Sequence, residues 1–212
     1  MEKRAITITS KLDTRIKIDV IPGHFATTHS HINYYIDMTG IKSQVRMARE
    51  AGIQMATKYT SVPIDTIICM DGCEVIGSFL ARELTKRGTV SMNSGGNMNL
   101  VTPEFNANGQ IIFRDNTQSM IWNKNVLLLM ASATTGKTIN RCLECIKYYG
   151  GNVIGISTIF SAVEEQQGIK VDTLFSTDDV SNYNSYGFTE CPYCQKRQKI
   201  DAIVNSYGYS KI

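Results

Sequence analysis

The stretch of residues 125–160 constrains the fold of this chain more than any other part of the sequence. It begins with residues 126–130, a short apolar run typical of a strand buried on both faces of a parallel sheet. Apolar residues then recur at helical spacing. Gly150-Gly151 is expected to end this helix in a left-handed conformation, before a second apolar run at 153–160. The stretch therefore predicts a βαβ unit.

Between this strand and the helix lies a segment of small and hydroxylated residues. The free N–H groups and the positive end of a helix dipole favour an anion at such a turn, and a phosphate fits best. The simpler alternative is a polar helix entry with a threonine cap. We predict that the phosphate site consists of Ser132, Ala133, Thr134, Thr135, Gly136, Lys137 and Thr138.

The same loop satisfies the loose form of the Walker A pattern, with Ala131 in place of the first glycine and Gly136-Lys137-Thr138 at its end. A Walker loop normally follows an early strand and contains several glycines, whereas this one lies past the middle of the chain and has one. No convincing apolar strand ending in a magnesium-binding aspartate follows. A P-loop NTPase is therefore only a distant alternative.

A second unit of strand, short loop and helix precedes the first. Residues 64–70 form an apolar run after Pro63, and residues 75–87 have helical periodicity that ends at Gly88. Asp71, Gly72, Cys73 and Glu74 form the tight connection. The simpler interpretation is that the two carboxylates cap the helix and complement its dipole.

The two units, taken in this order, resemble the type I phosphoribosyltransferases. In that family an apolar strand, two acidic residues, two further residues and Thr-Thr-Gly-Gly-Thr form the loop for phosphoribosyl diphosphate (PRPP). Here residues 126–129 resemble the strand and residues 134–138 resemble the phosphate cradle. Residues 64–81 resemble the diphosphate loop of the adenine, xanthine and orotate enzymes. The resemblance covers roughly residues 60–180 and is nearest to the orotate branch.

This resemblance implies an α/β fold with a mainly parallel sheet and helices on both faces. We expect one domain with an N-terminal hood at 1–40, a core at 41–180 and a C-terminal extension at 181–212. The implied reaction transfers ribose 5-phosphate from PRPP to a nucleobase such as orotate, with Mg²⁺ as cofactor. Residues 132–138 would bind the 5′-phosphate, and residues 71–74 the diphosphate. A nucleoside monophosphate is a further expected ligand, and a homodimer the expected assembly.

The sequence departs from the family at the acidic pair, where Met130 and Ala131 stand, and at the second glycine, replaced by Lys137. In the family those carboxylates hold the ribose hydroxyls, so we assign no catalytic residue. The alternative is a non-catalytic protein that senses PRPP or a nucleotide on the same fold. If the two positions match, introducing aspartate at both is expected to raise transfer activity. Lys137 adds a charge-assisted donor beside the phosphate.

Residues 89–124 contain Gly- and Asn-rich turns, including 94–97 and 106–109, which predict a mobile flap or a surface hairpin. In the resembled family a flexible loop closes over PRPP with basic residues, and here only Arg114 and Lys124 are available within or just after it. In the resembled fold a turn after the last strand commonly contacts the base, which implies Phe175 and Tyr183 as candidates to stack on it. The single tryptophan, Trp122, is expected in the core.

The three histidines, His24, His29 and His31, lie within eight positions of one another. They could line a substrate pocket or bind metal, or they could belong to a polar loop whose side chains bond to the backbone. The resemblance places them in the hood that covers the base.

Two cysteine pairs with CxxC spacing occur, at 142/145 and 191/194, and four thiolates could in principle bind zinc. Cys142 fits the apolar face of a helix, so packing is favoured there, and we assign no metal ligand. Cys191-Pro-Tyr-Cys194 matches the glutaredoxin tetrapeptide, but only 18 residues of the 212 follow it, which disfavours a redox fold.

Near the N-terminus, two alternating runs at 5–9 and 16–21 predict a hairpin or an edge extension that ends at Pro22-Gly23. A helix is expected from about residue 41 to residue 59, capped by Thr39, with Lys42 on its solvated face.

The 212 residues, with 42% hydrophobic content, can bury one good core. The net charge of +3 is too small to indicate nucleic acid or a membrane surface as a partner. Without an apolar run of membrane-spanning length or a signal-peptide core, we expect a cytoplasmic protein.

Overall fold

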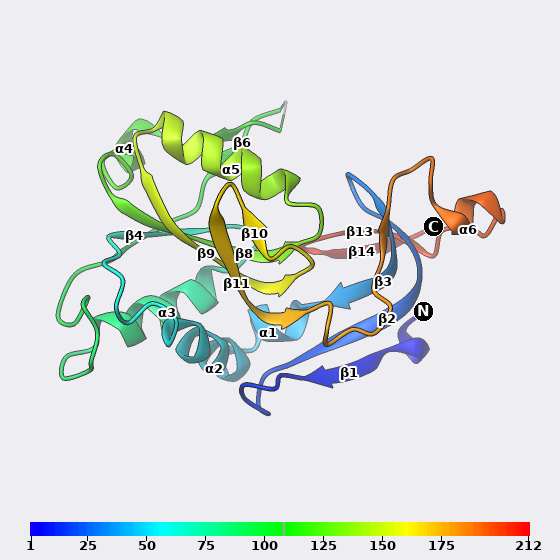
Figure 1. Ribbon diagram of the computed structural model, residues 1–212, viewed down its shortest axis with the longest axis horizontal. Helices are drawn as coiled ribbons and strands as arrows, with labels where there is room; N and C mark the ends of the chain where they lie inside the picture. The colour runs from blue at the N-terminus through cyan, green and yellow to red at the C-terminus, as the bar shows by residue number, and fades with distance from the viewer. Residues whose placement is uncertain (108) are drawn as a thin grey trace.

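The computed structural model describes residues 1–107 and 109–212, and its centre is a sheet with the strand order β10-β11-β9-β8-β4-β5 (Figure 1). Neighbouring strands are parallel except at the β10 edge, where β10 and β11 form an antiparallel pair. The strands are β4 (Thr66–Cys69), β5 (Asn99–Val101), β8 (Asn125–Ala133), β9 (Asn152–Ser161), β10 (Glu165–Gln166) and β11 (Ile169–Ser176).

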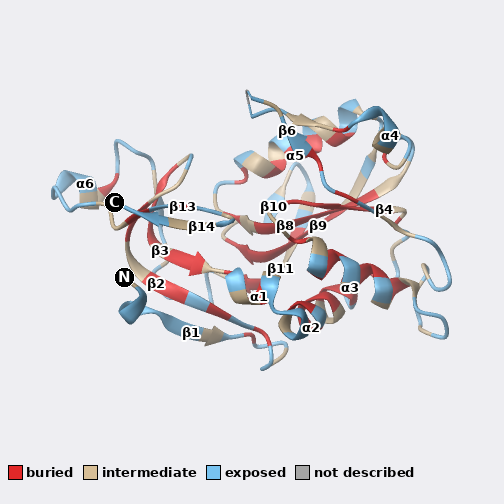
Figure 2. Ribbon diagram, turned by 180° about the vertical axis from the view of Figure 1, so that it is seen from behind, coloured by how far each residue is buried: buried red, intermediate tan, exposed pale blue. Residues whose placement is uncertain are grey.

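Helices cover both faces of this sheet. α5 (Lys137–Tyr148) lies on one face, and α2 (Val45–Ala56) and α3 (Glu74–Thr85) lie on the other (Figure 1). Successive residues of β8 point to opposite faces, so Leu127 packs in the core under α2 and α3 while Leu128 packs under α5. Figure 2 shows the buried strands between the more exposed helices. The predicted α/β class, a mainly parallel sheet with helices on both faces, is confirmed.

A second sheet forms the hood, with the order β12-β3-β2-β13-β14 and β1 paired to the first half of β2. Its strands are β1 (Ile6–Thr9), β2 (Lys17–Ala26), β3 (His31–Asp37), β12 (Ser185–Tyr186), β13 (Ala202–Asn205) and β14 (Gly208–Lys211). The segment predicted as a C-terminal extension therefore supplies three hood strands. Both ends of the chain lie on this side of the molecule (Figure 1).

Two boundaries in the N-terminal part differ from the sequence prediction. The hairpin of β1 and β2 is confirmed, but β2 continues through Pro22-Gly23 to Ala26, with a register shift between Pro22 and Phe25. A bulge explains how a strand can accommodate proline, which donates no ladder hydrogen bond.

The predicted helix 41–59 is two helices, α1 (Thr39–Ser43) and α2, separated at Gln44, whose backbone is extended. Thr39 is the first residue of α1 and not its cap. Its backbone N–H is instead bound by Asp37 Oδ1 at 2.9 Å. The backbone therefore turns at Gln44, which lets the short α1 contact the hood while α2 stays on the central sheet.

Trp122 is 67% exposed, so its prediction as a core residue is wrong. Its ring lies against Gly150, where a Cβ would be 3.1 Å from the indole Cε3, and it covers the turn after α5. The remaining elements are η1 (Glu2–Arg4), β6 (Glu104–Phe105), β7 (Ile111–Ile112), α4 (Asp115–Gln118) and α6 (Pro192–Gln195). Among the described residues, no helix has the length and apolar character needed to cross a membrane.

Candidate functional site

The predicted phosphate loop connects β8 to α5. β8 is longer than the sequence indicated, because Ser132 and Ala133 still pair with Phe160 and Ser161 of β9. The loop proper is therefore Thr134-Thr135-Gly136, a three-residue turn at the carboxyl edge of the central sheet. This is the edge at which open α/β sheets bind their ligands.

Gly136 is the residue that allows this turn. It has a φ of 71°, and a Cβ at this position would lie 2.2 Å from Oε1 of Gln166. As the N-cap of α5 it has no side chain to satisfy the first N–H groups of the helix, and the first helical bond runs from Asn140 N to Gly136 O at 2.9 Å. The N–H groups that precede this bond are free to bind an anion.

The loop borders a cavity of about 200 Å³ between the central sheet and the hood. All seven residues predicted from the sequence line it: Ser132, Ala133, Thr134, Thr135, Gly136, Lys137 and Thr138. The β2–β3 turn, the Asp71 loop and the β13–β14 turn close the other sides. The structure thus brings four separate parts of the sequence together at one place.

The hood contributes His29 to this cavity. Burial lowers the pKa of His29, and the positive charges of Arg141 and Lys137 lower it further. Two cations close enough to affect the imidazole indicate a positive potential at the mouth of the loop, which favours an anionic ligand.

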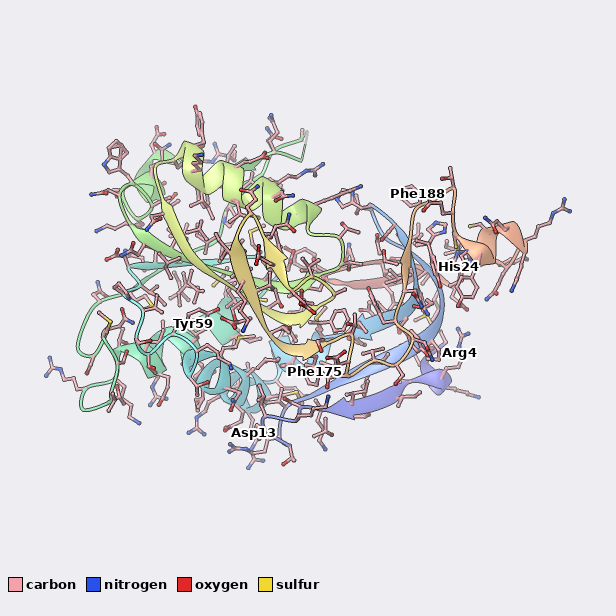
Figure 3. All side chains as sticks on the ribbon, in the orientation of Figure 1. Arg4, Asp13, His24, Tyr59, Phe175 and Phe188 are labelled. Atoms are coloured by element: carbon pink, nitrogen blue, oxygen red, sulfur yellow. The ribbon has the colours of Figure 1, made fainter. Side chains whose placement is uncertain are left out.

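Tyr183 and Phe175, the two aromatic candidates for stacking on a base, differ in their position relative to the cavity. Tyr183 lines the cavity, and its Oη lies 3.5 Å from Thr134 Oγ1. Burial raises the pKa of this phenol. Phe175 is fully buried in the core at the end of β11 (Figure 3), so it cannot stack on a ligand in this conformation.

Of the predicted diphosphate loop, only Asp71 lines the cavity among the described residues. Asp71 and Gly72 both have left-handed backbones, with φ of 60° and 77°. Cys73 is fully buried, and Glu74 accepts a hydrogen bond from Thr102 Oγ1 at 3.2 Å. Burial raises the pKa of the Asp71 carboxyl, although hydrogen bonds from Ser206 and the Ala131 backbone act in the opposite direction.

Lys42 holds this loop in place, and its prediction on a solvated helix face is wrong. Its Nζ donates to the carbonyl oxygen of Asp71 at 3.0 Å and also to that of Ser206. Ser206 Oγ in turn donates to Asp71 Oδ1 at 2.9 Å, between residues 135 positions apart. This clamp joins α1, the Asp71 loop and the β13–β14 turn.

We expect Lys42→Met to lower the free energy of unfolding by about 1–3 kcal/mol, because two half-buried carbonyl oxygens lose a charged donor. Urea denaturation measures this change. The matched control is Arg46→Met, which removes a cation from an exposed position of α2. Equal effects of the two substitutions would show that the clamp does not contribute.

The positions of the missing acidic pair lie inside β8. Met130 is 1% exposed and Ala131 fully buried, and their side chains belong to the cores on opposite faces of the sheet. Met130 nevertheless lines the cavity, whereas a carboxylate at position 131 would enter the core. The expected gain in activity from aspartate at both positions is therefore not kept for position 131, where we expect a loss of stability.

Arg114, predicted in a flap over PRPP, does not line the cavity in the described structure. It forms an ion pair with Glu104 at 2.5 Å beside the small β6–β7 hairpin. This hairpin packs on α5, where Cys145 Sγ donates to Ile111 O at 3.3 Å. Asn108, in the predicted turn 106–109, lies outside the described residues.

The other histidines and cysteines considered from the sequence lie either in the core or in one cluster in the hood. Cys142 packs in the core under α5, as predicted. His24 and His31 lie next to Cys191 and Cys194, an association that was not predicted from the sequence. Nothing in the local sequence pattern joins positions 167 residues apart.

Comparison with known proteins identifies the architecture. An orotate phosphoribosyltransferase of Desulforamulus reducens is 21% identical over 182 residues, which cover 84% of this chain and 85% of that protein. A phosphoribosyltransferase from Corynebacterium diphtheriae superposes with a TM-score of 0.54 at 16% identity, over 76% of this chain and 90% of that one. The chain has the type I phosphoribosyltransferase fold.

A further solved structure with the type I phosphoribosyltransferase fold is the orotate phosphoribosyltransferase of Mycobacterium tuberculosis in complex with PRPP. It has a TM-score of 0.51 at 15% identity and covers 69% of this chain and 83% of that one. No protein-family model matches the chain. The resemblance inferred from the two loop units is thus supported by the whole sheet with its helices, and not by those motifs alone.

Proposed function

We propose that this protein is a phosphoribosyltransferase that transfers ribose 5-phosphate from PRPP to a nucleobase such as orotate. The observation that carries the proposal is the single cavity bordered by the β8–α5 loop, the Asp71 loop and the hood. PRPP, which has a 5′-phosphate and a diphosphate, together with a separate nucleobase needs these three surfaces at one place. The orotate phosphoribosyltransferase that matches by sequence favours orotate as the base.

In this proposal the 5′-phosphate binds at residues 134–138. The N–H groups of the first turn of α5 and the hydroxyls of Thr135 and Thr138 donate to its oxygens, and Lys137 supplies a positive charge. The base enters under the hood, where Tyr183 lines the cavity. Binding the two ends positions the ribose carbon for attack by the base nitrogen.

The residues present fit a magnesium ion, because Mg²⁺ is typically held by one or two carboxylates together with substrate phosphates. Asp71 is the one carboxylate among the described residues that line the cavity, and it would hold the ion with the diphosphate. When bound, Mg²⁺ neutralises charge that develops on the leaving diphosphate. Lys42 keeps the Asp71 loop in position for this role.

A second candidate function is a PRPP or nucleotide sensor without turnover. The residues at positions 130 and 131 favour it, since the side chains of Met130 and Ala131 supply no carboxylate for the ribose hydroxyls. Asp71 is then the only acidic group of the described cavity, which would support binding better than catalysis.

Calorimetry with PRPP and Mg²⁺, followed by turnover assays with a panel of nucleobases, tests the proposal. We expect PRPP to bind and diphosphate to be released with at least one base. We also expect Asp71→Asn to reduce turnover about 10- to 150-fold, the equivalent of one charged hydrogen bond. Asp178→Asn, at an exposed position, is the matched control.

Three outcomes separate the alternatives. PRPP binding without turnover on any base identifies the sensor. Micromolar ATP affinity that disappears in Lys137→Ala, with no PRPP binding, identifies a P-loop protein. Turnover at family-typical rates that is unchanged by Asp71→Asn would contradict the role given to that carboxylate. A homodimer, which the resemblance implies, is tested separately by analytical ultracentrifugation.

A further inference from the structure

Four potential metal ligands meet at the outer end of the hood, away from the candidate phosphate loop. They are His24 on β2, His31 on β3, and Cys191 and Cys194 around α6. Their ligand atoms all lie within 4.8 Å of one another. Figure 3 shows His24 beside α6 and Phe188 at this end of the molecule.

The hairpin places the two imidazoles on one face. Ala26 pairs with His31, and His24 lies two positions before Ala26, so both histidines project from the same side of the sheet as diagonal neighbours. His24 Nε2 and His31 Nδ1 are 3.1 Å apart. Cys191 is the N-cap of α6 and Cys194 lies in its first turn, a spacing that lets two thiols face one point.

We propose that these four side chains form a structural Cys₂His₂ zinc site. In a tetrahedral zinc site with standard bond lengths the ligand atoms are about 3.3–3.8 Å apart. Here Cys191 Sγ lies 3.4 Å from His24 Nε2, and Cys194 Sγ lies 3.3 Å from His31 Nδ1 and 3.7 Å from His24 Nε2. Only small movements would be needed to centre an ion among them.

The surroundings of the cluster orient the ligands. His24 Nδ1 lies 3.0 Å from the carbonyl oxygen of Gln198, so Nδ1 carries the hydrogen and donates it, leaving the lone pair of Nε2 for a metal. Tyr193 stacks on His24 and Phe188 packs edge-on against His31, which shields the site from solvent on two sides.

The chemistry favours zinc over hard cations, because thiolate and imidazole are soft or borderline ligands. Two thiolates and two neutral imidazoles balance the charge of Zn²⁺, so the complex is neutral. Three of the ligands, His24, His31 and Cys191, are buried, and a neutral complex avoids the cost of a buried net charge. Binding releases one proton from each thiol to solvent.

The site joins two segments that are distant in sequence. His24 and His31 flank the turn of residues 27–30, which lines the candidate binding cavity, and α6 leads into β13, which pairs with β2 next to His24. A metal at this point would hold the hood hairpin to residues 191–194 and would fix the position of that turn.

Metal content of the untagged full-length protein, purified without added chelator, tests the proposal. We expect about one zinc per chain. After removal with a strong chelator, titration with ZnCl₂ should restore it, and CoCl₂ should give the visible spectrum of tetrahedral thiolate-bound cobalt. The melting temperature of the metal-free protein should be lower by on the order of 5–10 °C.

Cys194→Ser and His24→Gln each remove one ligand and should weaken zinc binding more than about 100-fold. Cys145→Ser is the matched control, since this half-buried thiol on α5 is outside the cluster. If a variant fails to fold, the wild-type zinc content and cobalt spectrum still decide the question.

Wild-type protein without stoichiometric zinc and without a tetrahedral cobalt spectrum would overturn the proposal. So would a Cys191–Cys194 disulfide in protein purified under reducing conditions, or equal zinc binding in Cys194→Ser and the wild type. None of these readouts involves PRPP, so this site and the proposed transferase activity can fail independently.

Discussion

Ala131→Asp is expected to destabilise the protein by on the order of 3–5 kcal/mol, because the new carboxylate enters a core without a partner. Ala131 is fully buried in the centre of β8 and packs with the residues under α2 and α3. The backbone of Ala131 is hydrogen-bonded to the Asp71 carboxyl, so a second buried carboxylate here would lie close to an existing one and its pKa would be raised.

The pH dependence of stability distinguishes the effect of the new charge at position 131 from the effect of a larger side chain. A carboxyl with a raised pKa binds more protons in the folded state, so the stability of Ala131→Asp falls as pH rises from the unfolded pKa to the folded one. Ala131→Asn has a similar volume and no charge, so its loss of stability should not change over that range. Denaturation of both variants at pH 5 and pH 8 measures the difference.

A folded Ala131→Asp protein with wild-type stability and faster turnover would contradict this expectation. It would mean that β8 can end earlier, as the family motif implies, and present the new carboxylate to the ribose. The test therefore also distinguishes two explanations for Met130 and Ala131 at the positions of the acidic pair. Either β8 extends further here than the corresponding strand of the family, or only the two side chains differ.

Gly136→Val is expected to reduce PRPP affinity about 100-fold or more, which calorimetry would measure. Valine at a φ of 71° is strained, and its Cβ would approach Gln166 Oε1 to 2.2 Å. The Gln166 side chain can rotate away from the new Cβ, but the strain at positive φ is relieved only if the loop backbone moves. The N–H groups at the start of α5 then no longer converge on one phosphate. Losing two charge-assisted hydrogen bonds of about 1.5–3 kcal/mol each accounts for an effect of this size.

The matched control is Gly88→Val. Gly88 has a similar φ of 78°, and a Cβ there meets no atom of the described residues within 4 Å. It lies after α3 and does not line the cavity. The control therefore carries the same backbone strain without the contact to Gln166. Similar losses of affinity in the two variants would show that general destabilisation, and not the geometry of the loop, is responsible.

The central sheet could be predicted from the sequence because its signals are local. Each strand, loop and helix of the two βα units is continuous in the chain, and the apolar runs have the period of buried strands. The residues of the β8–α5 loop that line the cavity could be predicted in the same way, since Gly136 and the helix start lie next to the strand that positions them.

The rest of the cavity could not be predicted, since it is formed by pairings between distant residues. Ser206 reaches Asp71 across 135 positions, and Lys42 looked solvated because its carbonyl partners come from two other segments. The end of β8 was also misplaced, because the continuation through Ser132 and Ala133 depends on their pairing with β9. Local propensity contains no information on these contacts.

The hood sheet also sets an order of events during synthesis. Strands β4 to β11 come from one continuous stretch of the chain. By contrast, β2 can pair with β13 only after residues 202–205 have been synthesised. The hydrogen bond of 2.7 Å from Arg4 to Asp201 likewise joins residues 197 positions apart. We infer that the central sheet can form while the ribosome is still translating the hood's last strands. The candidate phosphate loop between β8 and α5 is then formed before the hood closes the cavity. A nascent chain released before residue 202 would contain this loop but would lack the β13–β14 turn, whose Ser206 donates a hydrogen bond to Asp71.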